Sequence, residues 1–347
     1  MGTGALALAL GQFPTMPRLA RIGEALWLCD VLLFAIFATL TLIRAMRHPD
    51  ATRATLEDPV ASMFYGCAVM GLATIANGFL LYGPGLIGPA AVTAATVLWV
   101  IDAALAILCG LALPFLMFTR QRHGLEAMTA VWLLPVVAAE VAAVTGALLL
   151  SHVTDPGLAM GVLFASLVLW ALSVPVALSI LTVLFLRLAL HKLPPAEMAP
   201  SSWLALGPLG TGALGLVLFA QNGTAVLAGA GIALPVAEAF GGAALLGGAL
   251  IWGYGLWWLG IAVLVTARHV LRADLPFTPG WWGYTFPLGV FALATLRLAQ
   301  QLPVPGLTAF GASLVAVLAV NWTIVATATL SATLRTLSAP RPVAEAA

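Results

Sequence analysis

Nine stretches of this sequence are each long and apolar enough to cross a lipid bilayer, and this feature restricts the possible folds most. A helix needs about 20 apolar residues to cross the hydrocarbon layer. Pro, Gly or charged residues mark most of the gaps, and no gap is long enough for an aqueous domain. We therefore predict an all-α integral membrane protein. The predicted spans are 24–46, 59–82, 88–118, 126–150, 157–186, 200–222, 236–267, 279–301 and 307–334.

Charged side chains are scarce, which excludes several classes of protein. Asp, Glu, Lys and Arg make up 8% of the 347 residues, against about 25% in soluble domains. The apolar runs do not alternate with a period of two, so an outer-membrane barrel is not expected. A net charge of +1 provides no basic surface for nucleic acid. The three cysteines are isolated from one another and from histidine, so we expect no catalytic, cofactor or metal site.

Basic residues are concentrated in every second loop, and this pattern predicts the orientation. Loops on one side carry 11 of the 14 Lys and Arg residues. Because the cytoplasmic side collects basic residues, we predict a cytoplasmic C-terminus in a cell (plasma or inner) membrane. Residues 1–337 form one predicted transmembrane domain, and residues 338–347 form a short cytoplasmic tail. Met1–Leu10 would rise only about 15 Å as a helix, half of a tenth span. We number the spans with this segment as the first, so that 24–46 is the second span and 279–301 is the ninth.

The chain also shows signs of an internal repeat. Clusters of basic residues recur roughly every 70 residues, which is the length of one helical hairpin. The motif W-x-x-D occurs in successive even-numbered spans as Trp27-Leu-Cys-Asp30 and Trp99-Val-Ile-Asp102, with Trp170-Ala-Leu-Ser173 as a weaker copy. We therefore predict that helical hairpins are the repeating unit.

Odd-numbered spans share residues that weaken a helix, at a matching depth of one-third to one-half from the cytoplasmic loop. Pro removes a backbone hydrogen bond and kinks a helix. Matching kinks in every second helix predict an inner ring of bent helices around a central path. The alternative is that these Gly and Pro residues serve only helix packing. The predicted pore-lining kinks are Gly66, Gly71, Pro135, Pro208 and Pro287.

Several short motifs resemble the tellurite-resistance/dicarboxylate transporter family, which includes plant slow-type anion channels and fungal malate and sulfite carriers. They occur over nearly the whole chain, in the order and spacing of that family. The motifs are Met1-Gly-Thr-Gly4, Met70-Gly-Leu-Ala-Thr-Ile-Ala-Asn-Gly78, Trp132-Leu-Leu-Pro135, Leu193-Pro-Pro195, Pro200-Ser201 leading to Gly207-Pro-Leu-Gly210, and Trp281-Trp-Gly-Tyr-Thr-Phe-Pro287.

This resemblance implies five helical hairpins in a ring, with odd-numbered helices lining the pore, and a homotrimer of separate pores. It also implies that a Phe in the ninth helix plugs the path, and the matching residue here is Phe286. Tyr284 and Phe291 are the fallback candidates, and ordinary packing of Phe286 is the alternative. Relatives usually carry residues before the Met-Gly-Thr-Gly motif, so the first helix is expected to be truncated in this sequence.

Charged residues inside the spans need a reason, because burial in lipid is costly. Glu140 is a candidate substrate or proton site, and the alternative is a protonated carboxyl bonded between helices. Arg297 could attract anions at the outer mouth, or could extend to the lipid headgroups. For Asp30 and Asp102 we expect inter-helix bonding or a trimer contact.

The predicted function is transport of small anions, in the first place C4-dicarboxylates such as malate. Sulfite or tellurite efflux, a non-selective chloride or nitrate channel, and a structural or receptor role are the alternatives. Both a channel and a proton-coupled carrier remain open. An enzyme is not expected, because haem ligation or a Ser/His pair would need an intramembrane histidine. All five histidines lie in loops or at span ends: His48, His123, His152, His191 and His269.

Overall fold

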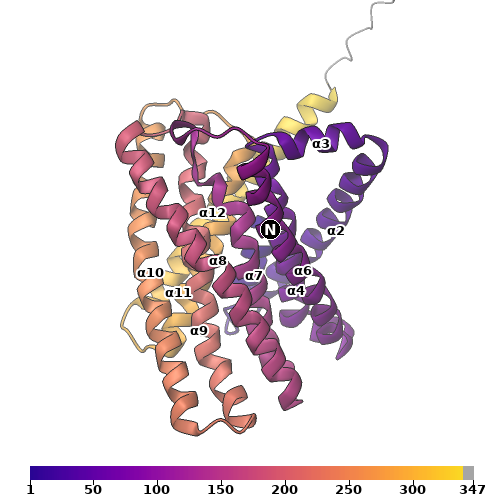
Figure 1. Ribbon diagram of the computed structural model, residues 1–347, viewed down its shortest axis with the longest axis vertical. Helices are drawn as coiled ribbons and strands as arrows, with labels where there is room; N and C mark the ends of the chain where they lie inside the picture. Colours follow the sequence, from indigo (N-terminus) through magenta and orange to yellow (C-terminus); the bar gives the residue numbers. More distant parts are fainter. Residues whose placement is uncertain (339–347) are drawn as a thin grey trace, which may run out of the picture.

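A computed structural model describes residues 1–338, and all the regular elements within them are helices (Figure 1). Eight helical segments are long and apolar enough to cross a membrane. Every predicted span coincides with helical structure, so the all-α membrane fold is confirmed. The ninth span, 279–301, contains a short 3₁₀ segment followed by a 16-residue α-helix. The predicted tail lies outside the described residues, apart from Ser338.

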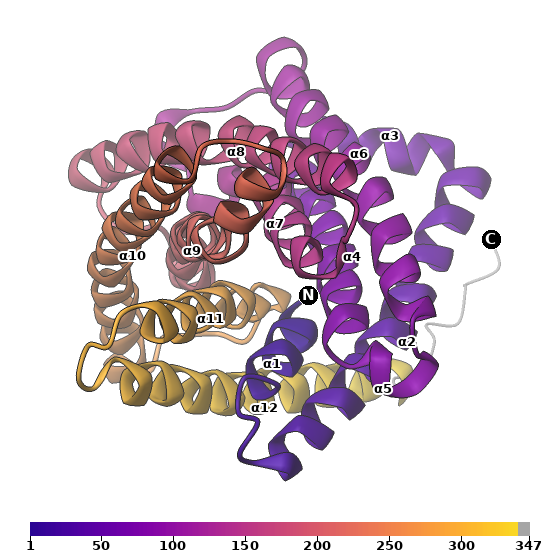
Figure 2. The same cartoon turned by 90° about the horizontal axis from the view of Figure 1, so that it is seen from below.

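The helices form two concentric rings (Figure 2). The inner ring consists of α1 (Gly2–Leu10), α4 (Tyr65–Leu81), α7 (Leu134–Leu149), α9 (Leu206–Gly229) and α11 (Phe286–Gln301). The outer ring consists of α2 (Pro17–Arg47), α6 (Ala90–Thr119), α8 (Pro156–His191), α10 (Leu234–Leu271) and α12 (Leu307–Ser338). Each inner helix is followed in the chain by an outer one, which gives the predicted arrangement of helical hairpins around a centre.

Burial separates the two rings clearly. In the most apolar stretch of the segments containing α4, α7 and α9, 67%, 94% and 83% of the residues are buried. The corresponding share in the outer helices is only 11% to 33%. All nine residues of α1 are buried as well. The outer ring therefore faces lipid and shields the inner ring from it.

A tryptophan in each outer helix ties one hairpin to the next. Its indole N–H donates a hydrogen bond to the inner helix of the following hairpin, over 2.9 to 3.2 Å. The sequence motif identified the first three members of this set and missed the last two. The five bonds join Trp27 to Ile75 O, Trp99 to Ala142 O, Trp170 to Gly212 O, Trp252 to Thr295 Oγ1, and Trp322 to Thr3 Oγ1.

The fifth bond closes the ring, because it runs from α12 back to α1. Trp322 and Thr3 are 319 residues apart in the chain. The short helix α1 also packs against α2, α4, α11 and α12. Although α1 is only nine residues long, it therefore occupies the fifth position of the inner ring.

Four of the inner helices described here begin with a change of helix type. Short 3₁₀ segments, Ala61–Phe64, Ala130–Leu133, Ala196–Ala205 and Pro279–Tyr284, precede α4, α7, α9 and α11. Pro135 and Pro287 are each the second residue of their α-helix, and Pro208 is the third of α9. Pro fits the first turn because its missing N–H would have no helical partner there. The three prolines therefore lie where the 3₁₀ segments meet the α-helices, and their role in lining a pore stays a prediction.

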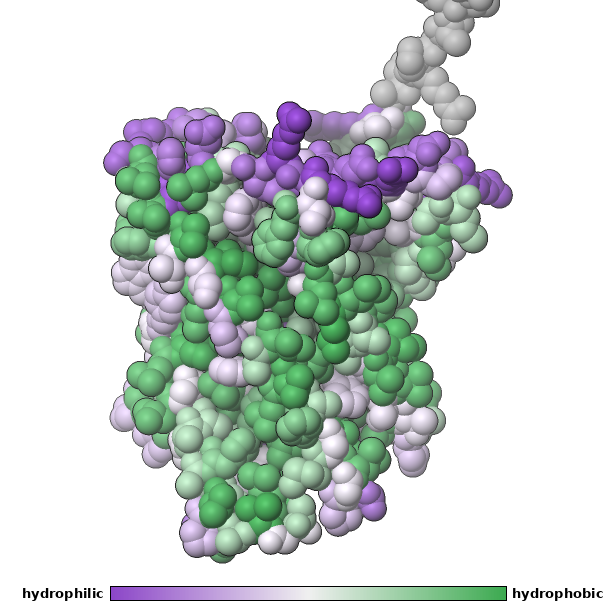
Figure 3. Space-filling view, in the orientation of Figure 1, coloured by the Kyte–Doolittle hydropathy of each residue, from purple (hydrophilic) through white to green (hydrophobic). Residues whose placement is uncertain are grey.

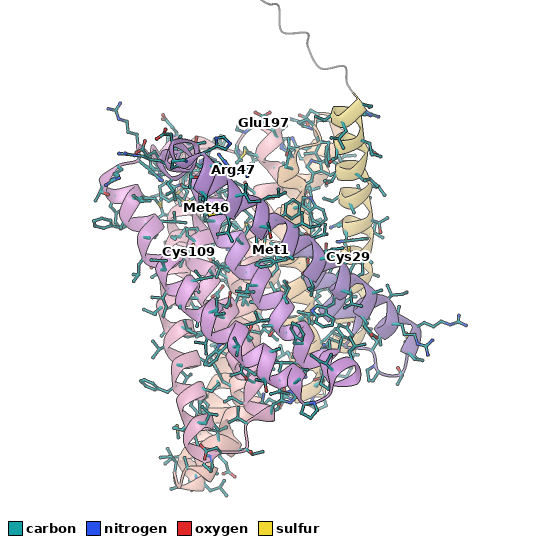
Figure 4. All side chains as sticks on the ribbon, turned by 90° about the vertical axis from the view of Figure 1, so that its right-hand side faces the viewer. Met1, Cys29, Met46, Arg47, Cys109 and Glu197 are labelled. Atoms are coloured by element: carbon teal, nitrogen blue, oxygen red, sulfur yellow. The ribbon has the colours of Figure 1, made fainter. Side chains whose placement is uncertain are left out.

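Polar residues gather at one end of the molecule (Figure 3). The last turns of α2, α10 and α12 carry basic residues at this end, and the short helix α3 (Pro49–Glu57) lies across it (Figure 1). Arg47 and Glu197 both lie at this end, whereas Met1 lies about halfway along the long helices (Figure 4). We refer to this end as the basic face. Along the sequence, loops rich in basic residues alternate with loops that have few. In the structure, the two kinds of loop lie at opposite ends of the molecule.

Candidate functional site: the central conduit

A cavity of about 230 Å³ lies between the inner helices, at the end opposite the basic face. All five inner helices contribute to its wall, so it lies on the axis of the ring (Figure 2). Its apolar lining includes Leu8, Leu80, Leu148, Leu218 and Leu293. The inner ring therefore encloses space at the end opposite the basic face, as expected for one mouth of a conduit. We call this space the outer cavity.

Phe286 lies on the stripe of α11 that faces this axis. Leu293 and Arg297 line the cavity, and Phe286 precedes them by seven and eleven residues, which are close to two and three helical turns. The three side chains therefore share one face of the helix. At 1.5 Å per residue, Phe286 lies about 10 Å deeper than Leu293. Its side chain is 3% exposed, consistent with a position inside the ring.

Both fallback candidates for the gate point away from the axis. The ring of Phe291 stacks on Trp252 of the outer helix α10, with centroids 6.0 Å apart and an interplanar angle of 3°. Tyr284 packs edge-on against Trp203 and Trp281 and lines a groove between α10 and α12. Phe286 is thus the aromatic residue of this motif with an inward position. Its role as a gate stays a prediction.

The glycines predicted to line the pore lie at contacts between helices. A methyl group on Gly66 would overlap the carbonyl oxygen of Leu134, so Gly66 lets α4 approach the start of α7. Gly71 faces Phe34 of the outer helix α2. Neither glycine lines the outer cavity. Their position agrees with the packing alternative.

Glu140 is fully buried where α7 meets α8 and α9. A methyl group on Gly212 would lie 3.6 Å from Glu140 Oε2 and 3.1 Å from Val174 Cγ2. Neither carboxyl oxygen of Glu140 has a hydrogen-bond partner among the described residues. The side chain therefore lies in the wall of the conduit, outside the set of residues that line the cavity.

Asp30 and Asp102, three residues after their tryptophans, lie inside the protein. Thr74 Oγ1 of α4 donates a hydrogen bond to Asp30 Oδ2 over 3.1 Å, which links the outer ring to the inner one. Asp102 is 0% exposed, and its carboxyl oxygens have no partner within residues 1–338. The inter-helix bond expected for Asp30 is therefore present, whereas Asp102 has none among the described residues. A trimer contact stays a prediction.

The electrostatic character of the conduit is neutral with a positive bias. Arg297 lines the outer cavity, and no Asp or Glu of the described chain does. All five inner helices point their C-terminal halves at the cavity, so the partially negative ends of their dipoles lie on the cavity side. Arg297 carries the full positive charge of the cavity wall and opposes these dipole ends.

Sequence reasoning missed most of the polar residues of the cavity. They lie near the outer ends of the inner spans, and this clustering near one depth was the available signal. Periodicity could not show that they face the axis. They are Gln12, Asn77, Ser151, His152, Gln221 and Asn222.

Residues 1–330 match the family model described as voltage-dependent anion channel. This chain belongs to the voltage-dependent anion channel family. The match confirms the resemblance seen in the sequence motifs and the multi-pass membrane character of the fold. Members of this family are channels and transporters, and their shared chemistry is the movement of anions.

Named relatives of the voltage-dependent anion channel family include proteins for two different anions. The chain is 34% identical to a sulfite efflux pump of Arthroderma benhamiae, over 94% of this chain and 86% of the pump. It is 21% identical to the malic acid transport protein of Schizosaccharomyces pombe, over 93% of this chain and 74% of that protein. An uncharacterized transporter of Methanocaldococcus jannaschii is 29% identical over 85% of this chain.

Proposed function

We propose that this chain moves small anions across a cell membrane through the centre of the inner ring. One observation carries this proposal: all five inner helices enclose a cavity that is lined by an arginine and by no carboxylate of residues 1–338. Weak, uncompensated positive charge suits transport, because an ion must leave the site as well as enter it. The basic face is then cytoplasmic under the positive-inside rule, and so is the C-terminus.

Sulfite is the substrate we propose to test first. The relative that is 34% identical to this chain is named for sulfite efflux, whereas the relative named for malic acid is 21% identical. A C4-dicarboxylate such as malate is the second candidate. The similarity to the malic acid protein favours it, because that similarity extends over 93% of this chain. Tellurite, chloride and nitrate complete the panel of anions.

Purified protein in liposomes tests this function directly. We expect labelled sulfite to leave loaded vesicles faster than from protein-free vesicles, and external malate to slow this efflux if both anions share the path. Protein that moves none of the anions, although it is monodisperse and folded, would leave the structural or receptor alternative. Repeating the assay under an imposed pH gradient distinguishes a proton-coupled carrier from a channel.

The conduit closes, in this proposal, at Phe286. A buried aromatic side chain in an apolar constriction blocks ions by its bulk and by excluding water. The axis-facing stripe of α11 and the outward positions of Phe291 and Tyr284 support this choice. Glu140 is the candidate proton carrier, since it is the unpartnered acid in the wall of the inner ring.

We further propose a homotrimer in which each subunit has its own pore, because all five walls of the conduit come from one chain. The exposed apolar side chains of the outer helices supply surface for both lipid and neighbouring subunits. Cross-linking in native membranes measures the assembly independently of transport. Since the named relatives are transporters, we propose no enzymatic activity.

A further inference from the structure

The outer cavity is lined by more polar side chains than a path for anions requires. Each inner helix, or the turn that follows it, contributes a polar side chain that contains nitrogen to the lining of this cavity. α9 brings two of them. The set comprises Gln12, Asn77, His152, Gln221, Asn222 and Arg297, and we call it the vestibule ring.

Asn77 is the most informative member of the vestibule ring. Its side chain is 6% exposed and lines the cavity, and its Oδ1 atom has no hydrogen-bond partner among the described residues. The amide nitrogen also makes no hydrogen bond within residues 1–338. Buried polar groups are normally paired, so the free NH₂ group of Asn77 is available as a donor to a ligand in the cavity, and its Oδ1 is available as an acceptor to water.

Arg297 supplies positive charge without local compensation. Its guanidinium forms no ion pair in the described part of the chain, and its one hydrogen bond is a 3.4 Å contact with Gln300 Oε1. Among the residues that the structure describes, no carboxylate lines the cavity beside it. The fork of N–H donors on a guanidinium matches two oxygens of one anion.

The neighbouring amides leave donors free for the same anion. Gln12 Nε2 donates to Leu8 O, and Asn222 Nδ2 donates to Ala147 O. A side-chain NH₂ group has two N–H bonds, so each amide keeps one. Donors then reach the cavity from several helices, which suits an anion with several oxygens better than a spherical halide.

We propose that the vestibule ring is a low-affinity binding site for a small oxyanion, a sulfite or a carboxylate, at the outer mouth. The inference rests on the proposed transport function and adds a site to it. A cavity of about 230 Å³ holds roughly seven waters at about 30 Å³ each, so the anion keeps part of its hydration. Arg297 binds two of its oxygens, and Asn77 donates to a third.

The position of the ring determines what it controls. It lies about 16 Å beyond Phe286 along α11, at 1.5 Å per residue, so it acts on entry and release at the outer mouth. Changes in the ring therefore alter the anion concentration at half-maximal flux. They leave the closure at Phe286 intact.

Three variants in liposomes test the site, with sulfite and chloride as probes. For Arg297→Gln we expect about a tenfold rise in the half-saturating sulfite concentration, the effect of losing one charge-assisted hydrogen bond. Asn77→Leu should raise it about threefold. Arg297→Lys keeps the charge but loses the fork, so sulfite should weaken while chloride changes little. Arg18→Gln is the control, because Arg18 is exposed on the outer side and lies outside the cavity.

Direct titration of sulfite into purified protein gives a second readout that does not depend on flux. Wild-type flux combined with unchanged sulfite affinity in Arg297→Gln and Arg297→Lys would overturn the vestibule site and leave transport standing. An equal effect of Arg18→Gln would also overturn it, by reducing it to surface charge. Wild-type protein that moves no anion would overturn the proposed function instead.

Discussion

The inner and outer rings are built from similarly apolar helices but obey different constraints. An outer helix packs on one side and meets lipid on the other, so most of its surface accepts any apolar residue. An inner helix is surrounded by protein and by the conduit, so the size of each side chain matters. In the most apolar stretches, 94% of the residues are buried in the segment containing α7 and 11% in α2. Hydropathy alone therefore cannot assign a helix to a ring.

The largest effect that the two rings should show concerns glycine. A methyl group on Gly66 overlaps backbone of α7, whereas Gly253 in α10 has open space around it. We expect Gly66→Ala to cost about 3 kcal/mol, because backbone cannot move aside cheaply. Gly253→Ala should be neutral or slightly stabilising, since alanine favours a helix. Thermal unfolding in detergent measures both, and equal losses would break the comparison.

Phe286 of the inner ring and Phe118 of the outer ring extend the comparison of the two rings from stability to anion flux. Phe286→Ala should raise anion flux about tenfold or more, which corresponds to lowering the barrier by about 1.4 kcal/mol. Phe118 is 81% exposed at the end of α6, so Phe118→Ala should leave flux unchanged. Liposome flux per mole of folded protein is the measurement. Unchanged flux in well-folded Phe286→Ala protein would end the gate assignment.

The five tryptophans that bond to the next inner helix should show an intermediate effect on stability. Trp322→Phe removes the bond to Thr3 that closes the ring, and we expect a loss of about 1 kcal/mol, within the range for hydrogen bonds between membrane helices. Trp257 is 45% exposed on α10, so Trp257→Phe should cost less. Comparing their unfolding temperatures sharpens the distinction between a bond across the rings and packing at the lipid face.

The smallest effect on stability is expected for the two unpartnered acids. Glu140→Gln and Asp102→Asn each keep the shape of the side chain and should change stability by less than about 1 kcal/mol, the usual net contribution of one hydrogen bond, because the carboxyl oxygens have no partner among the described residues. If Glu140 carries protons, Glu140→Gln should also flatten the pH dependence of flux, while Asp102→Asn should not. The same pH profile in both variants and the wild type would remove Glu140 from the mechanism.

The repeat shows how far sequence reasoning reached. The W-x-x-D motif identified Trp27 and Trp99, and more weakly Trp170, because a Trp followed three residues later by a polar residue recurs in these spans. Trp252 and Trp322 escaped because their third following residues are Gly255 and Val325. The feature that all five tryptophans share is visible only in the structure. Each indole N–H donates a hydrogen bond to the next inner helix.

The candidate site was predicted unevenly for a related reason. Phe286 and Arg297 could be selected from their motif and charge, but their shared face depends on where α11 begins and how it is rotated. The place of Pro135, Pro208 and Pro287 in the first turns of their α-helices could not be predicted, because Pro weakens a helix interior and also suits a first turn. Local sequence does not distinguish these two positions when the preceding residues form a 3₁₀ segment.

The sequence by itself determined the membrane class, the spans and the alternation of basic loops, because transfer into lipid depends on the apolar length of each segment separately. Only the tertiary structure decided which helices are inside, which faces meet at the axis, and that α12 closes onto α1. These features depend on contacts between segments tens to hundreds of residues apart. No local pattern contains the rotation of a helix that is apolar on every side.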